Sequence, residues 1–405
     1  MTMATSRDID HRVLGGVCAG LAARYEHDVK SVRLITVLLA VVTAGLGGVA
    51  YLAAWRILPT SPATHAVSDA TASPDARDAV AAEPGTTEAL YGSIAGDLPQ
   101  VEELILSLAD VEMPWLREMM EAMLSGSGKK MRPALALLAG RYGNYNLELL
   151  VPLAASIEIL HTATLVHDDV IDEAAERRGK PTAAALFGNS ASVMLGDYMF
   201  AHAAEFIART DNTRVVRHFA RTLGRMASGE LEQDISAFQY SGDVQKYLDR
   251  IGGKTASLFA TAVEGGGIVS GAPEPQVEAL RHYGESLGMA FQIVDDILDF
   301  TGDPEVMGKP AGSDLREGTL TLPSLFYMQQ QPEGNPVKLA FDDIDRDANL
   351  TRAIEEIRGS TALDEAAQAA RRFGDRAREA LSALPAGEER DRLDGLVDYV
   401  LERDS

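Results

Sequence analysis

The chain divides into three stretches by the pattern of its hydrophobic and polar positions. The 22 residues from Leu34 to Trp55 carry no charge, and a membrane-spanning helix needs about 20 such residues. Residues 60–96 are rich in Ala, Thr, Ser, Pro and Asp, a composition typical of a disordered linker. Further on, apolar side chains recur at helical spacing, which predicts an all-α fold. We therefore expect a membrane-associated domain at 1–59, the linker, and a helical domain at 97–405.

The apolar stretch raises a conflict of topology, because basic residues precede it, namely Arg7, Arg12, Arg24, Lys30 and Arg33. Under the positive-inside rule, a single span would keep these residues in the cytosol and place the helical domain outside. Glycines at 45, 47 and 48 permit a hairpin instead, whose halves of about 11 residues, roughly 16 Å each, are too short to cross a bilayer. We expect a re-entrant or interfacial hairpin at 34–58 that anchors the chain on the cytoplasmic face of the cell membrane.

Composition narrows the possible partners. The chain has 37 basic and 60 acidic residues and a net charge of −23, so it lacks the basic footprint that a nucleic-acid partner requires. Its single cysteine, Cys18, excludes an internal disulfide framework and fits a reducing compartment.

Two acidic motifs carry the candidate chemistry, Asp168-Asp-Val-Ile-Asp172 and Asp295-Asp-Ile-Leu-Asp299. Positions i and i+4 of a helix share one face, so the first and last Asp of each motif point the same way. A single copy is more often an acidic helix face in water. The second copy, however, has apolar flanks, and buried carboxylates need positive partners. The pair therefore predicts a site for a hard cation such as Mg²⁺.

A third acidic stretch, Phe341-Asp-Asp-Ile-Asp345, lacks this geometry, because the residue four after Asp342 is Arg346. We interpret it as a polar loop. A basic, glycine-rich stretch at 126–133 is predicted to open a helix with Pro133 in its first turn. Helix N-termini attract anions, although an ordinary basic turn fits the same pattern.

These motifs stand in the order found in the trans-isoprenyl diphosphate synthases, which residues 97–405 resemble through 167–172, 177–182 and 291–299. The resemblance implies an isoprenyl-synthase-type helical bundle around a deep central cavity, and a homodimer with three Mg²⁺ ions per active site. The implied substrates are isopentenyl diphosphate and an allylic prenyl diphosphate. Residues 7–59 resemble the phage-shock-protein-C domain, which implies membrane association, with either signalling or simple anchoring as its role.

The resemblance also implies roles for individual residues. It makes Asp168, Asp172 and Asp295 metal ligands, supported directly or through water by Asp169, Asp296 and Asp299. It assigns the binding of isopentenyl diphosphate to Lys129, Lys130, Arg132, His161 and Arg178. It assigns the binding of the allylic diphosphate to Arg177, Lys254, Thr255, Gln292 and Lys309. From the residues alone, His161 can equally be a core histidine and Lys254 a solvated charge.

Product length is expected to depend on Ala163 and Thr164, which lie one helical turn, roughly 6 to 7.5 Å, below Asp168. In the family that residues 97–405 resemble, aromatic side chains at this level stop elongation of the prenyl chain early. Both residues are small, so we expect a long product of about 30 carbons or more, with the next obstacle one turn further down. The candidates for that obstacle are Ile159, Leu160, Met194 and Tyr198. The alternative interpretation is that Ala163 and Thr164 are small only to permit helix packing.

Three other functions stay open at this stage. The chain could be a short-chain synthase that makes farnesyl or geranylgeranyl diphosphate. It could be a membrane stress-response protein with a non-catalytic synthase-like domain, although both Asp motifs are intact. A terpene cyclase also uses Asp-rich motifs, but it lacks the loop Gly128-Lys-Lys-Met-Arg-Pro133.

Overall fold

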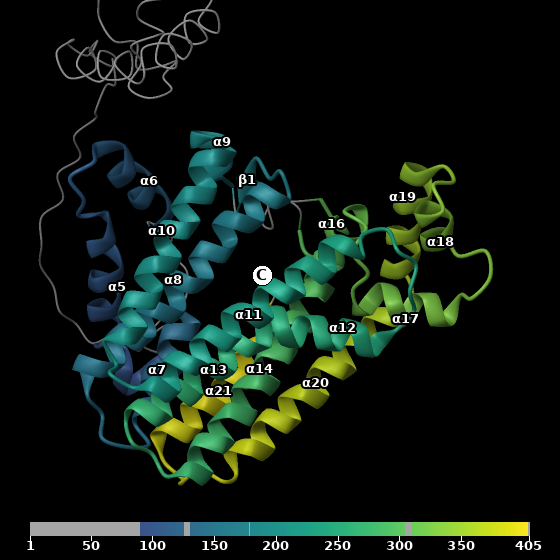
Figure 1. Ribbon diagram of the computed structural model, residues 1–405. Coiled ribbons are helices and arrows are strands. Elements are labelled where there is room, and N and C mark those ends of the chain that lie inside the picture. The colour runs from purple at the N-terminus through teal and green to yellow at the C-terminus, as the bar shows by residue number, and fades with distance from the viewer. Residues whose placement is uncertain (1–89, 125–129, 178, 304–309, 404–405) are drawn as a thin grey trace, which may run out of the picture. The chain divides into compact units, whose positions relative to one another are not determined.

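The computed structural model describes residues 90–124, 130–177, 179–303 and 310–403 of the chain (Figure 1). All of them belong to the second of two units, residues 80–405. The predicted all-α fold is confirmed. The strands within the described ranges are two short segments, β1 (Glu176–Arg177) and β2 (Lys180–Pro181), which pair antiparallel. The predicted membrane hairpin at 34–58 lies outside the described residues.

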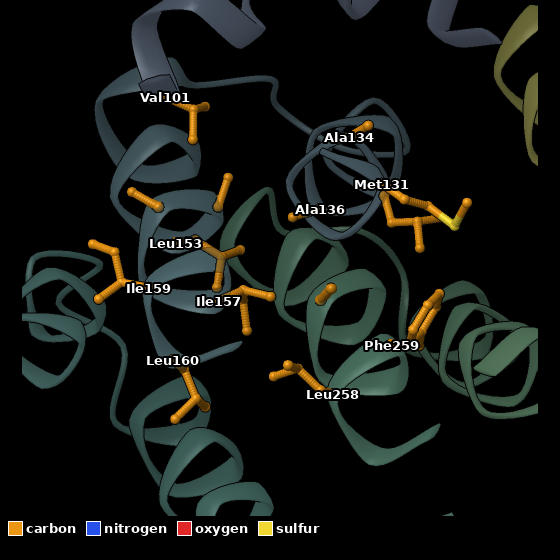
Figure 2. Close-up of a cluster of buried hydrophobic side chains, with 14 of the residues drawn as sticks. Val101, Met131, Ala134, Ala136, Leu153, Ile157, Ile159, Leu160, Leu258 and Phe259 are labelled. Atoms are coloured by element: carbon orange, nitrogen blue, oxygen red, sulfur yellow. The ribbon is translucent and has the colours of Figure 1, made fainter. Parts of the chain in front are cut away.

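The fold is built around α8 (Leu147–Ile171), which is apolar on all sides and therefore suited to a buried position. Asn146 caps it by accepting a hydrogen bond from the backbone N–H of Glu148 at 3.0 Å. Its neighbours are α5 (Leu98–Leu106), α7 (Met131–Gly140), α10 (Asn189–Ala208) and α13 (Ser257–Val269). Figure 2 shows Leu153, Ile157 and Leu160 of α8 among the buried side chains of these helices.

By length and composition α8 is the one helix of the described residues that is able to cross a membrane. Within the protein, however, 67% of its apolar window is buried against other helices. This is the burial expected of a central core helix.

A second layer forms around α14 (Glu274–Thr301), the longest helix of the described residues. It packs against α13, α20 (Ala362–Leu381) and α21 (Glu388–Glu402), as Figure 1 shows. The two closing helices predicted at 361–383 and 387–403 are confirmed. The remaining helices of this half are α12 (Val244–Ile251), α16 (Ser313–Arg316), α17 (Leu322–Gln330), α18 (Pro336–Phe341) and α19 (Arg346–Arg358). The acidic stretch that ends at Asp345 is the turn between α18 and α19, as predicted.

Two further features position the candidate site. Helix α11 (Thr213–Ile235) runs beside a five-residue π-helical segment, η3 (Gly252–Ala256), which joins α12 to α13. The short helix α9 (Ala183–Phe187) follows the β1–β2 hairpin. π-Helical segments are rare and occur frequently at functional sites.

The folded part begins earlier than the sequence predicts. Residues 90–96 fall in the expected linker, yet they contain the short helix η1 (Gly92–Ile94). Tyr91 and Ile94 are fully buried in the same core as α8. Further along the chain, α5 is followed by η2 (Ser107–Ala109) and α6 (Pro114–Leu124). Because the linker prediction rested on overall composition, it missed the large side chains of Tyr91 and Ile94. Residues 60–89 lie outside the described residues.

Candidate active site

The first Asp motif occupies the C-terminal end of α8. Asp172 caps the helix, and its N–H donates to the carbonyl of Asp168 at 2.8 Å, which keeps the two side chains one turn apart on one face. Asp169 points the other way. It is buried and accepts a hydrogen bond at 2.7 Å from Nε of Arg177 on β1. The hairpin therefore folds back onto the motif, and one predicted diphosphate ligand contacts the middle aspartate.

A lysine of η3 supplies positive charge near Asp168 and Asp172, the first and last aspartates of the first motif. Lys254 forms an ion pair with Glu230 of α11 and reaches Gln233 Oε1 at 3.4 Å. Burial raises the pKa of Asp168 to about 7, while the positive charge of Lys254 opposes the shift and the negative charge of Glu230 adds to it. Burial also raises the pKa of Asp172, again against Lys254. A dication bound nearby would favour the charged form of both carboxyl groups and so oppose the effect of burial.

The second Asp motif lies in the last two turns of α14. Asp296 is buried and accepts hydrogen bonds from the Tyr247 hydroxyl at 2.6 Å and from Gln292 Nε2 at 2.9 Å. The amide oxygen of Gln292 in turn accepts from the Thr255 hydroxyl at 2.7 Å. Burial raises the pKa of Asp296 to about 8, and the hydrogen bonds from Tyr247 and Gln292 only partly offset this.

The remaining two aspartates of this motif differ sharply in exposure. Asp299 is buried and accepts a hydrogen bond at 3.3 Å from the backbone N–H of Asp314, in the first turn of α16. Asp295 is half exposed and pairs with Arg403 Nη2 at 2.7 Å. Arg403 follows α21, so the end of the described chain reaches the second motif.

Segment η3 brings the two motifs to one place. Lys254 faces the first motif, and the next residue, Thr255, is bonded through Gln292 to the second. A Cβ on Gly253 would lie 3.2 Å from the carbonyl of Arg225, so the small residue permits the close approach of α11 that places Glu230 beside Lys254. The two motifs are 123 residues apart in sequence, counted from Asp172 to Asp295. In the fold they lie on either side of the five-residue segment η3.

The six aspartates fall into two groups. Asp169, Asp296 and Asp299 are buried and bonded to the protein, whereas Asp168, Asp172 and Asp295 are more exposed. Carboxylate oxygens are the donors that Mg²⁺ prefers, so the chemistry of the exposed set fits a hard dication. Among the described residues, no three His, Cys, Asp or Glu side chains are gathered closely enough to form a ready-made metal site. Among the described residues, Lys254, Arg177 and Arg403 place positive charge near the exposed aspartates.

The residues expected to bind isopentenyl diphosphate lie at the start of α7 and on α8. Lys130 precedes α7 in a left-handed conformation (φ 48°) and pairs with Glu158 at 3.5 Å. The guanidinium of Arg132 lies 4.7 Å from the ring centre of Phe259, and His161 is partly exposed on α8. Lys129, Arg178 and Lys309 lie outside the described residues.

The two expected product-length residues of α8 differ in burial, because Thr164 is partly exposed. Ala163 is fully buried, and the Thr164 hydroxyl donates to the carbonyl of His161 at 2.8 Å. Ile159 and Leu160 are also fully buried below them (Figure 2). Met194, one of the four candidates for the next obstacle, is 71% exposed in the described chain. Helical spacing located Met194 on α10 but could not tell which face of α10 meets α8.

Sequence reasoning missed two residues of the site. Tyr247 and Arg403 bond the second motif, but they lie 49 and 108 residues from Asp296 and Asp295. For Arg403 a signal existed in the sequence, because Tyr399-Val-Leu-Glu-Arg403 resembles the C-terminal sequence of the trans-isoprenyl diphosphate synthases.

Two hollows of the described structure lie away from the aspartates. The larger, of about 650 Å³, is lined by residues that include Arg225, Gly252, Met289 and Arg376, and the smaller, of about 170 Å³, adjoins it at Leu248. None of the predicted site residues lines either of them. The expected deep cavity is therefore not one of these two hollows.

An all-α bundle that holds two Asp-rich motifs beside basic side chains is the arrangement expected from the resemblance to the trans-isoprenyl diphosphate synthases. The family model described as Polyprenyl synthetase matches residues 113–357, and that of the PspC domain matches residues 4–61. The chain belongs to the polyprenyl synthetase family, is a prenyltransferase, and carries an N-terminal PspC domain.

Known proteins agree with this assignment along the helical part. Component 2 of the heptaprenyl diphosphate synthase of Geobacillus stearothermophilus is 38% identical over 317 residues, which are 78% of this chain and 99% of that protein. The crystal structure of a decaprenyl diphosphate synthase from Rhodobacter capsulatus matches with a TM-score of 0.74 and 40% identity, covering 79% of this chain and 100% of that one. A polyprenyl synthase from Caulobacter crescentus, complexed with calcium and isoprenyl diphosphate, matches with a TM-score of 0.74 and 35% identity, covering 80% and 100%.

Proposed function

We propose that the protein is a Mg²⁺-dependent synthase that condenses isopentenyl diphosphate head-to-tail onto an allylic prenyl diphosphate and makes a long-chain product. The observation that carries this proposal is the meeting of both Asp motifs at η3, with three carboxylates left accessible. The Caulobacter relative, which was crystallised with calcium and isoprenyl diphosphate, supports the pairing of a divalent cation with this ligand.

The allylic substrate binds at the accessible carboxylates. Asp168, Asp172 and Asp295 would hold Mg²⁺, three ions per active site, which neutralise the charge that develops on the departing diphosphate. Lys254 leaves Glu230 for a diphosphate oxygen, and Arg177 and Lys309 add positive charge. The C–O bond to the diphosphate breaks and leaves an allylic carbocation, so this stabilisation of the leaving group is the main source of rate.

The second substrate is held by the loop before α7 and by α8. Lys129, Lys130, Arg132, His161 and Arg178 bind the diphosphate of isopentenyl diphosphate and bring its double bond in line with the cation. Positioning of this kind lowers the barrier because the entropy of alignment is lost on binding. After the new C–C bond forms, the departed diphosphate accepts the proton that is lost, and no side chain has to act as the base.

The product is long and feeds isoprenoid or quinone biosynthesis. Support comes from the small size of Ala163 and Thr164 one turn below Asp168, and from relatives that are named heptaprenyl and decaprenyl synthases. A short-chain synthase is the second candidate, because structures named as geranylgeranyl diphosphate synthases also match.

The chain works as a homodimer at the membrane. Helices α10 and α11 expose large apolar side chains, namely Val193, Met194, Val216, Leu231 and Ile235, and such surfaces are typical of subunit interfaces. The PspC match supports a membrane location, and we place the catalytic domain on the cytoplasmic face, anchored through residues 34–58. A non-catalytic stress-response protein and a terpene cyclase are the alternatives that an activity test must separate.

The test is product analysis with isopentenyl and farnesyl diphosphates. Wild type with Mg²⁺ should yield linear products longer than the primer. Asp168→Ala and Asp295→Ala should each lower turnover by about 10²-fold or more, the effect of removing one preorganised electrostatic group. Asp342→Ala, in the turn that mimics the motif, serves as the matched control and should keep full activity.

Each alternative has its own outcome. Cyclic products would indicate a terpene cyclase, and the absence of any product would indicate a binding role. Full activity in EDTA would contradict the metal-dependent mechanism.

A further inference from the structure

The guanidinium of Arg403 lies against the carboxylate of Asp295 in the second motif. Its side chain is only 9% exposed, and Nη2 donates to Asp295 Oδ1 at 2.7 Å and to the carbonyl of Phe291 at 3.2 Å. The charged group stacks 3.9 Å from the ring centre of Phe291. Arginine is well suited to such a position, because its planar group can stack and hydrogen-bond at once.

This position does not satisfy the side chain completely. Nε of Arg403 is buried and makes no hydrogen bond to any described residue. A buried donor without a partner costs stability, which reduces the cost of moving the side chain elsewhere. Arg132 also lies over Phe291, at 5.9 Å from its ring centre, so the ring joins the end of the chain to the expected isopentenyl diphosphate loop.

We propose that Arg403 is a positioning residue that holds Asp295 in the cation-free enzyme and is exchanged for the divalent cation when the site is loaded. This inference rests on the proposed function, because it takes Asp295 to be a cation ligand. A guanidinium and a dication compete for the same carboxylate oxygens. Among the described residues, Asp295 is the one of the three accessible aspartates whose carboxylate is bonded to an arginine. Cation binding at the second motif is therefore coupled to release of the C-terminal end from α14.

The experiment measures cation binding directly in the full chain. Free Mn²⁺, a stand-in for Mg²⁺, is followed by its electron paramagnetic resonance signal during titration of detergent-solubilised protein. Arg403→Gln should bind Mn²⁺ about tenfold more tightly than wild type, the scale of one nearby charge at intermediate dielectric. Arg403→Lys, which keeps the charge, should restore most of the wild-type affinity.

Two controls separate competition from other causes. Arg392→Gln removes the same charge from α21, where it pairs with Glu388, and should leave Mn²⁺ affinity unchanged. In an Asp295→Asn background, Arg403→Gln should have no effect, because the shared carboxylate is gone.

The opposing outcomes are distinct. If Arg403→Gln lowers the melting temperature without tightening Mn²⁺ binding, the contact is structural and the inference is overturned. If Arg392→Gln tightens binding equally, the effect is general electrostatics and the inference is again overturned. Product formation by wild type reports on the proposed function separately, so a failure of one is not mistaken for a failure of the other.

Discussion

At the scale of single residues, the second motif shows how one residue type acquires three roles within two helical turns. Asp295 is half exposed and paired with an arginine, Asp296 is buried among neutral donors, and Asp299 supports the start of α16. The difference lies in the direction each side chain takes from α14. Burial is the dominant cause of the raised pKa of Asp296 and favours the protonated form of this carboxyl.

The raised pKa of Asp296 predicts a specific pH dependence of stability. Between its unfolded value of 3.8 and about 8 in the fold, the folded state binds the extra proton, so stability falls as pH rises through this window. One such group contributes at most about 1.4 kcal/mol per pH unit. Asp296→Asn stays neutral and can keep its hydrogen bonds if the amides reverse. In EDTA, the melting temperature of wild type should fall relative to that of the variant as the pH rises from 5 to 8, by several degrees in total, and the difference should level off by pH 9.

Thermal melts at intervals from pH 5 to 9 check this expectation. Some slope should remain in the variant, because burial also raises the pKa of Asp168 to about 7. Asp342→Asn, at an exposed position, should follow wild type throughout. Parallel curves for wild type and Asp296→Asn would show that Asp296 is ionised in the fold.

At the scale of elements, helix contacts depend on a few missing side chains. A Cβ on Gly196 of α10 would lie 2.1 Å from Nε2 of His167 on α8. The ring of His167 cannot move freely, because it bonds the carbonyl of Val193 at 3.0 Å and packs edge-on against Phe200. The sequence assigned His167 no role, and the structure gives it a packing role beside the first motif.

This contact predicts opposite effects for two glycine substitutions. Gly196→Ala should lower the free energy of unfolding by about 1–3 kcal/mol, since overpacking outweighs the gain in helix propensity. Gly224→Ala, on the exposed side of α11, should raise it by about 0.5–1 kcal/mol, because a Cβ there meets no described atom within 4 Å. Urea denaturation of both variants measures the difference. Equal effects would mean that the α8–α10 contact tolerates the extra carbon.

Helix α8 also provides the test of product length. Ala163→Phe places bulk one turn below Asp168 and should shorten the product toward about 15 to 20 carbons while leaving the first condensation intact. Because Ala163 is fully buried, Thr164→Phe, at a partly exposed position, provides a second variant if the first fails to fold. Ala348→Phe, at an exposed position of α19, is the control. Unchanged chain length in both α8 variants would show that this helix does not set it.

At the scale of the whole molecule, the catalytic part should work without the N-terminal domain. All predicted chemical residues lie after residue 97, and the buried core begins at Tyr91. A chain that begins at Val80 should keep wild-type turnover and product length in solution. One that begins at Gly92 loses Tyr91 and should be less stable by about 3–5 kcal/mol, the usual effect of deleting a large core side chain.

Tyr91→Ala in the chain that begins at Val80 provides the matched control and should reproduce that loss in a denaturation experiment. If the chain from Val80 folds but is inactive, residues 1–79 take part in the reaction, and our view of them as an anchor is wrong.

Local sequence pattern determined the class of fold and the existence of the two motifs. Helical periodicity is a property of the backbone, so the i, i+4 spacing of Asp168 and Asp172, and the closing helices at 361–383 and 387–403, followed without knowledge of packing. The same reasoning dismissed the stretch that ends at Asp345, which is a turn. Composition was less reliable, because an average over residues 60–96 hid the buried Tyr91 and Ile94.

Only the tertiary structure decided which aspartates remain accessible and what opposes their charge. Tyr247 and Arg403 reach the second motif from 49 and 108 residues away, and Lys254 acts on the first from η3. Such partners depend on how distant helices pack, and no local spacing encodes that packing. The same holds for Met194, whose helix was predictable but whose outward direction was set by the face of α10 that meets α8.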